Sequence, residues 1–154
     1  MLLKTLKIGN LSIQVPIIQG GMGVGISLSG LASAVANEGG VGVISAAGLG
    51  VIYKNLSKNY LEASILGLKE ELSKARQKTQ GVIGVNIMVA LSNFADLVRT
   101  AIAEKADIIF AGAGMPLNLP SFLQKDSTTK LVPIVSSGRA ANPRRACRPW
   151  QRVR

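Results

Sequence analysis

Short, nearly continuous apolar runs alternate with longer segments of helical periodicity along most of this chain. Runs of this kind are typical of parallel strands that are buried on both faces. In the segments between them, apolar residues recur three or four positions apart, as they do on the buried side of an amphipathic helix. The alternation predicts an α/β fold whose parallel strands are joined by right-handed crossovers. The five expected strands lie at 16–18, 41–45, 82–89, 107–110 and 131–135.

Local signals between these strands predict the helices and turns. Ser27 or Ser29 can cap the first helix, and the glycine-containing segment 37–40 ends it. Ser92 or Asn93 can cap a later helix in the same way. Ahead of the first strand, alternating apolar and polar residues around a Gly-Asn pair predict a small hairpin. The expected elements are this hairpin at 7–15, helices at 28–36, 58–79, 93–104 and 119–124, and a loop at 51–57.

Every predicted strand is followed at its carboxyl end by small or polar residues. In a (β/α)8 barrel these ends ring one mouth, where the active site lies, whereas in a doubly wound sheet they line one edge with a switch point. The pattern alone leaves both folds open. A complete barrel needs about 200 residues or more, so a barrel would be represented here by its first half. The strand-end segments are Gln19-Gly20-Gly21, Ser45-Ala46, Asn86, Ala111-Gly112-Ala113-Gly114 and Ser136-Ser137.

The first of these ends opens into a glycine-rich loop within PIIQGGMGVG, residues 16–25. Residues without a Cβ reach positive φ and let backbone N–H groups approach a flat ring or a phosphate. The same glycines are equally suited to a tight turn between a strand and a helix. Local pattern does not separate a ligand cradle from a structural turn.

Composition narrows the class of protein. With 154 residues, 47% of them hydrophobic, the chain is long and apolar enough for one globular domain with a core. Cys147 is the single cysteine and histidine is absent, which excludes a disulfide framework, a Cys/His zinc site and an imidazole base within these residues. No apolar run has the length of a signal-peptide core or a membrane span. We therefore expect a soluble, cytoplasmic protein without a membrane partner.

The net charge of +10 is concentrated at one end of the chain. Residues 139–154 hold six arginines and no acidic residue, which leaves twelve basic and eight acidic residues for the rest. An arginine-rich arm that binds phosphates is one interpretation of this tail. We favour an altered end without a selected role, because no interleaving of basic and aromatic residues extends into the body of the chain. Nucleic-acid binding is therefore not expected.

Four stretches together resemble the nitronate monooxygenase family, FMN enzymes once called 2-nitropropane dioxygenases, which share their fold with FMN-dependent enoyl-ACP reductases. The stretches occur in family order at strand ends and cover most of residues 5–142. The resemblance implies a (β/α)8 TIM barrel, of which this chain holds about the first five units. Residues 1–142 would form the amino-terminal part of the FMN-binding barrel and 143–154 a divergent basic tail. The matching stretches are LKIGNLSIQVPIIQGGMGVGIS, GLASAVANEGGVGVISAAGLG, GVNIM and LVPIVSSGRAA.

The same resemblance implies that FMN lies across the carboxyl-terminal mouth of the barrel, and it suggests which residues line the site. Asn86 matches the flavin-contacting asparagine of the family, and an amide that ties adjacent strands together is the alternative. Residues 112–115 would line the substrate side, or form a plain turn. The expected cofactor-binding residues are Gly20, Gly21, Met22, Gly23, Asn86, Ser136 and Ser137, and the expected substrate-side residues are Gly112, Ala113, Gly114 and Met115.

Members of this family oxidise an alkyl nitronate with O2 to a carbonyl compound and nitrite, so a small nitronate and O2 are the implied partners. The family's catalytic histidine and its late, glycine-rich phosphate loops have no counterpart in this sequence, so no catalytic residue is assigned. In the tail, Pro143 and Pro149 oppose the helix that the family has there. Cys147 has nothing nearby that would activate it as a nucleophile. We expect weak FMN retention and loss of activity for the chain by itself.

Two alternatives to nitronate oxidation stay open. A flavoenzyme of the same fold could reduce an enoyl thioester with NAD(P)H. An inactive partial barrel could instead bind ligand weakly or assemble with itself, because its first and fifth strands would have unpaired edges. Self-association through those edges is the expectation that follows from this second alternative.

Overall fold

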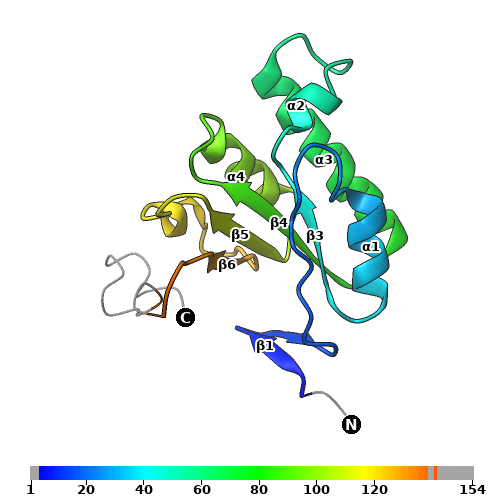
Figure 1. Ribbon diagram of the computed structural model, residues 1–154, viewed down its shortest axis with the longest axis vertical. Helices are drawn as coiled ribbons and strands as arrows, with labels where there is room; N and C mark the ends of the chain where they lie inside the picture. Colours follow the sequence, from blue (N-terminus) through cyan, green and yellow to red (C-terminus); the bar gives the residue numbers. More distant parts are fainter. Residues whose placement is uncertain (1–3, 139–140, 142–154) are drawn as a thin grey trace.

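The computed structural model describes residues 4–138 and Ala141, and its centre is a parallel sheet (Figure 1). The strands neighbour one another in the order in which they occur along the chain, and each register is parallel. The first three strands are mostly apolar and buried, as the sequence predicts for strands covered on both faces, whereas the last is only partly buried. The four strands are β3 (Val41–Ser45), β4 (Val82–Met88), β5 (Ile108–Gly112) and β6 (Lys130–Pro133).

Residues 16–19 add a fifth parallel segment beside β3. Ile18 forms an isolated parallel bridge with Val41, whose N–H donates to the carbonyl of Ile17 over 2.9 Å. The sequence predicts a full strand here, but the segment makes a single bridge because the backbone turns away into the glycine loop after Gln19. The sequential strand order distinguishes the two folds that the sequence left open, since a doubly wound sheet reverses its order at a switch point. The chain therefore forms a partial (β/α)8 barrel.

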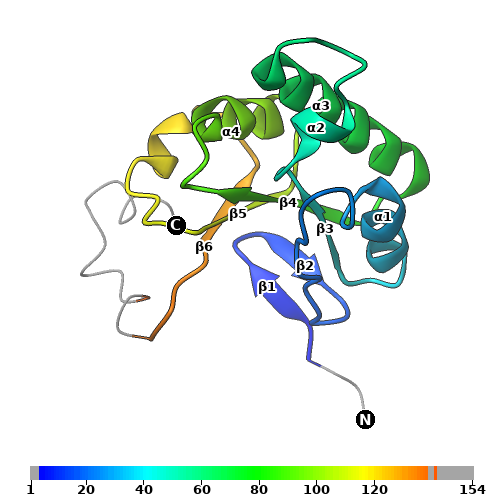
Figure 2. The same cartoon turned by 45° about the horizontal axis from the view of Figure 1, so that its top comes forward.

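All helices lie on one side of this sheet, as Figure 2 shows. Apolar residues of the longer helices pack against outward-facing strand residues such as Ile44, Val85 and Ile109 to form the larger core. None of the helices among the described residues combines the length and the apolarity that crossing a bilayer requires. The helices are α1 (Ser29–Asn37), α2 (Leu49–Ile52), α3 (Tyr60–Lys78) and α4 (Phe94–Ala103), with a 3-10 helix, η1 (Leu119–Phe122), ahead of β6.

The opposite face of the sheet carries the predicted hairpin, β1 (Leu6–Ile8) and β2 (Leu11–Ile13) (Figure 2). Its residue Ile13 is fully buried against the inner strand residues Val43 and Phe110. The sheet thus has a helix-covered outer face and an inner face whose core is closed by the hairpin. In the described part of the chain, residues 16–19 and β6 each have one neighbouring strand. Pairing of two copies through these edges stays a prediction.

Local predictions were wrong at several element ends. Asn93 takes the N-cap position of α4 but makes no side-chain cap hydrogen bond. Neither Ser27 nor Ser29 caps α1, because Leu28 occupies the N-cap position and makes no side-chain cap. The expected loop at 51–57 overlaps α2, which forms because Leu49 is buried in the larger core and Ile52 packs against it. β6 ends at Pro133 instead of Val135, although the next N–H still donates to the carbonyl of Ala111.

A buried carboxylate replaces the missing cap of α1. Glu71 of α3 is 3% exposed, and its carboxylate accepts the N–H of Ser29 over 2.5 Å and the hydroxyl of Tyr53. Burial raises the pKa of the Glu71 carboxyl, but these two hydrogen bonds and the Lys74 ammonium outweigh burial, so the pKa lies below its ordinary value. The pKa of Tyr53 is raised to about 12, mainly by burial and, to a smaller extent, by the hydrogen bond to Glu71. The contact joins α3 to the start of α1, directly after the glycine loop.

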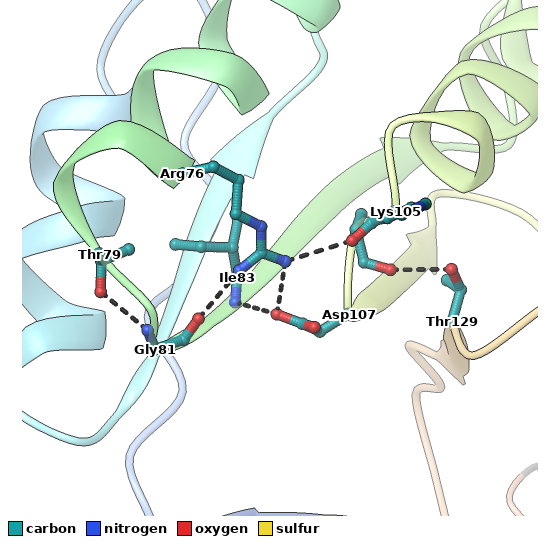
Figure 3. Close-up of polar contacts among 8 residues, drawn as sticks. Arg76, Thr79, Gly81, Ile83, Lys105, Asp107 and Thr129 are labelled. Carbon is teal, nitrogen blue, oxygen red and sulfur yellow. Dashed lines mark hydrogen bonds and ion pairs between the residues drawn. The ribbon is translucent and has the colours of Figure 1, made fainter.

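A second polar cluster holds the amino-terminal ends of the strands together (Figure 3). The Arg76 guanidinium donates to the carbonyls of Gly81 and Lys105 and pairs with the Asp107 carboxylate at 2.8 Å. The same carboxylate oxygen accepts the N–H of Ile83 at 2.8 Å. One arginine and one aspartate therefore connect α3, β4 and the segment that leads into β5.

Replacement of Asp107 by alanine is expected to destabilise the fold. The change leaves the buried N–H of Ile83 without its acceptor and the Arg76 guanidinium without its ion pair, which costs about 1–3 kcal/mol of unfolding free energy. Urea denaturation measures the loss. Asp126→Ala, at an exposed loop position, is the matched control and is expected to stay within about 0.5 kcal/mol of the parent. Equal stability of the two variants would contradict a structural role for the cluster.

The Glu71 contact predicts a pH dependence of stability. Because the folded-state pKa lies below the unfolded value of about 4.3, the contribution is present above that pH and is lost as the pH falls through the folded-state pKa. Glu71→Gln is therefore expected to lower the unfolding free energy by about 1–3 kcal/mol at pH 7 and by less at pH 3. Denaturation curves across this range test the difference, with the exposed neighbour variant Glu70→Gln as control. A stability gap that does not narrow at low pH would show that the charge of Glu71 is not involved.

Candidate functional site

The glycine loop leaves the sheet at Gln19, whose side chain continues the strand pairing after the backbone has turned away. The amide nitrogen of Gln19 donates to the carbonyl of Val43 over 3.0 Å, and the N–H of Val43 donates to the amide oxygen over 3.1 Å. The Gln19 amide thus makes the two hydrogen bonds to β3 that a following backbone residue would make if the strand continued. The backbone of Gly20 and Gly21 is consequently free to cross the carboxyl end of β3.

Ser27 closes the far end of the loop. Its Oγ accepts the N–H of Met22 over 2.9 Å and the amide of Gln19 over 3.1 Å, while its own N–H donates to the carbonyl of Met22 over 3.0 Å. The sequence pointed to Ser27 as a helix cap and gave Gln19 no role. A polar residue at the end of an apolar strand was the available signal for Gln19, but its partner on β3 could not be identified from sequence.

Gly21 lies directly on Asn86 of β4. A Cβ at position 21 would lie 2.5 Å from the Cβ of Asn86 and 3.3 Å from Val43, so only glycine fits this approach. Gly23 lies nearly as close to the segment that follows β3, since a Cβ at position 23 would lie 3.0 Å from the Cβ of Ala47. The structure therefore brings the glycine loop and Asn86 together on one rim.

Val24, further along the loop, has a φ of 54°. Branched side chains rarely adopt this left-handed region, and such strain is most often kept where a loop serves a ligand. The N–H of Val24 donates to the carbonyl of Ala47 over 2.9 Å, which fixes the loop against the end of β3. Met22, on the other side of Gly23, is 61% exposed and faces outward.

Several polar groups on this rim have no partner in the part of the chain that the structure describes. The side-chain amide of Asn86 makes no hydrogen bond there, so it does not tie adjacent strands together. The N–H groups of Gly21 and Gly23 likewise have no acceptor among the described residues. The Ser45 hydroxyl at the end of β3 is buried and has no hydrogen-bond partner within residues 4–138 and 141. Donors without partners at the carboxyl ends of parallel strands are suited to a bound polar molecule.

The expected substrate-side residues begin with the last residue of β5, Gly112, and continue into the loop after it, next to the end of β4. Gly112 is in register with Met88, and its carbonyl accepts the N–H of Val89 over 2.7 Å. Gly114 has a φ of 145° and packs against Val89, while Met115 is 72% exposed. This loop thus borders the same carboxyl-terminal edge as Asn86, from the neighbouring strand. Ala113 lies between the two glycines with a φ of 54°.

Ser136 and Ser137 follow the carboxyl end of β6, and their expected part in flavin binding stays a prediction. Both are exposed and follow the end of β6, which is separated from the Asn86 strand by β5. The tail residues 143–154, Cys147 included, lie outside the residues that the structure describes.

The rim is electrically neutral, which limits the groups that it can hold. Its residues offer backbone N–H groups, an amide and hydroxyls, and no group of three potential metal ligands occurs among residues 4–138 and 141. A flat, neutral heteroaromatic ring fits this donor set, so the residues present fit the ring of FMN. They do not supply a phosphate site at α1, because the Glu71 carboxylate already bonds the N–H of Ser29 at that helix end.

Comparison with known proteins points in the same direction. A sequence model of the nitronate monooxygenase family matches residues 4–152. The structure is similar to that of FabK from Thermotoga maritima, with 32% sequence identity and a TM-score of 0.63, over 84% of this chain and 36% of that one. A point mutant of the same FabK gives 33% identity and a TM-score of 0.67, over 84% and 38% of the two chains.

The comparison with curated proteins found no match. Against FabK, the chain spans a little over a third of the length of the protein that it matches. The family match covers nearly the whole chain, and the structural match exceeds 30% identity over most of it. The chain therefore belongs to the nitronate monooxygenase family, a family of flavin-dependent oxidoreductases.

Proposed function

We propose that this chain forms the flavin-ring side of an FMN-dependent site that oxidises alkyl nitronates with O2 to a carbonyl compound and nitrite. The observation that carries the proposal is the close approach of Gly21 to Asn86, which places a side-chain amide without a partner among the described residues beside the glycine loop at the carboxyl ends of the strands. Family membership supports the flavin, and the family's name supports the nitronate as substrate.

The residues of the rim would bind and orient the ring. The N–H groups of Gly21 and Gly23 and the amide of Asn86 are the donors available to polar atoms along its edge. Hydrogen bonds of Gln19 and Ser27 hold the start and the end of the loop. This lowers the entropic cost of ordering the donors when the ring binds. FMN, when bound, supplies the electron transfer between nitronate and O2.

The substrate would reach the ring from the side of residues 112–115. This loop is glycine-rich and borders Asn86 through the β4–β5 pairing, and it ends in the exposed side chain of Met115. Apolar surface of this kind suits the alkyl part of a small nitronate. The described residues of the rim offer no ionisable group that could remove a proton from a neutral nitroalkane.

A second candidate function is reduction of an enoyl-ACP thioester. It is favoured by the similarity to FabK, which exceeds 30% identity over 84% of this chain. The loop and Asn86 would serve the flavin in the same way in either reaction. The two candidate reactions differ in their electron donor, which is the nitronate or NAD(P)H, and in their electron acceptor, which is O2 or the enoyl thioester. Substrate assays can therefore distinguish them.

Gly21→Ala is expected to weaken FMN binding by roughly 10- to 100-fold. The added Cβ would lie 2.5 Å from Asn86, and relief of such overpacking costs about 1–3 kcal/mol. Quenching of FMN fluorescence on titration with protein measures the dissociation constant. The control is Gly30→Ala on α1, where a Cβ meets nothing within 4 Å and the affinity should not change. Equal affinity of the Gly21 variant and the parent would remove the loop from the binding site.

Substrate assays with added FMN separate the two candidate reactions. Because the chain has no histidine, nitrite release from a neutral nitroalkane is expected to equal that of free FMN. A preformed nitronate has already lost its α-proton, so it needs no base. Nitrite release is therefore compared between chain plus FMN and FMN alone with a preformed nitronate as substrate. Nitrite release above the FMN blank supports nitronate oxidation. NAD(P)H oxidation that requires crotonyl thioester, without nitrite release in the nitronate assay, would support the reductase instead.

A further inference from the structure

Ser45 carries a polar group that the fold leaves unused. The residue is 2% exposed, and its Oγ has no hydrogen-bond partner among the described residues. A buried hydroxyl without a partner is unfavourable for folding, because it has lost water and gained nothing in return. Such a group in a native structure calls for an explanation, and a ligand or an ordered water is the usual one.

Other buried serines of this chain show what a structural hydroxyl looks like. Ser64 donates to the carbonyl of Tyr60 over 2.7 Å, and Ser33 donates to the carbonyl of Gly30 over 3.1 Å. Ser27 bonds within the glycine loop. Each of these hydroxyls bonds to a group of its own helix or loop, whereas those of Ser45 and Ser127 have no partner among the described residues. Of these two, Ser127 lies in the loop ahead of β6, and Ser45 lies at a strand's carboxyl end, beside the glycine loop.

The side chain of Ser45 lies on the inner side of the sheet, under the glycine loop. It has the same strand parity as Val41 and Val43, which belong to the inner core, and it is in register with Asn86. A Cβ at Gly23 would lie 3.7 Å from the Ser45 Oγ. Because residue 23 has no side chain, the nearest loop group above this hydroxyl is backbone, and a ligand would reach the hydroxyl only where that backbone moves aside.

We propose that Ser45 is a further ligand-contacting residue, whose hydroxyl forms a hydrogen bond to a polar atom on the edge of the FMN ring. The inference rests on the proposed flavin site and adds to it a residue that neither the sequence motifs nor the family resemblance assigned. A hydroxyl can donate or accept, so it can pair with a ring carbonyl or with a ring N–H. Ser45 and Asn86 then present two neutral side chains from adjacent strands to the same ring.

The test is Ser45→Ala, measured in two ways on the full chain. Without FMN, removal of the unpaired hydroxyl is expected to raise the midpoint of thermal unfolding or leave it unchanged. With FMN, the dissociation constant from fluorescence quenching is expected to rise about 3- to 10-fold, the effect of losing one neutral hydrogen bond. The opposite signs of the two effects identify a residue that serves the ligand and not the fold.

Ser33→Ala is the matched control, because Ser33 is a buried serine whose hydroxyl bonds within α1. It is expected to lower the unfolding midpoint and to leave FMN affinity as in the parent. An unchanged dissociation constant for Ser45→Ala, with the parent binding FMN, would overturn the role of Ser45 alone. A lower midpoint for Ser45→Ala without FMN would show a structural partner and also overturn it. Absence of quenching by the parent chain would overturn the flavin site itself, and the role of Ser45 with it.

Discussion

The rim of this partial barrel depends on one side-chain amide that takes the place of a backbone strand. Gln19 bonds both the N–H and the carbonyl of Val43, at the point where its own backbone leaves the sheet. Because the β3 backbone is buried there, loss of this pairing would leave two polar groups without partners. The amide satisfies them and frees the following glycines to cross the strand ends. The close contact of Gly21 with Asn86 follows from this arrangement.

The two ends of the strands are built differently, and the difference separates stability from binding. At the amino-terminal end, Arg76 and Asp107 form a charged cluster in which the interactions connect three chain segments (Figure 3). At the carboxyl-terminal end, the residues are neutral and several donors have no partner among the described residues. In barrels of this type, binding residues gather at the carboxyl-terminal face, and residues at the other face mainly stabilise the fold. The place of the Arg76–Asp107 cluster, at the amino-terminal face, agrees with that division.

The sequence predicted the fold better than the details of the site. Short apolar runs identified β3, β4 and β5, because a strand buried on both faces must be apolar throughout. The pattern could not separate a barrel from a doubly wound sheet, since strand order depends on pairing between distant segments. The sequence also did not predict the role of Glu71, which lies on the apolar side of α3. Its burial is explained by the hydrogen bonds that its carboxylate accepts from Ser29 and Tyr53. Side chains that act on distant backbone leave no local signal.

Ser45 shows how the structure adds information at a position that sequence leaves neutral. A serine at a strand end is common, and its residue type indicates no function. Its burial and its lack of a partner emerge only when the glycine loop is folded over β3. Selection for stability alone would favour a residue without an unpaired hydroxyl at such a place. A polar group that costs stability at the mouth of a binding fold is therefore better explained by a ligand than by packing, and the neutral chemistry of its neighbours Asn86 and Gly23 indicates a ligand edge that is uncharged.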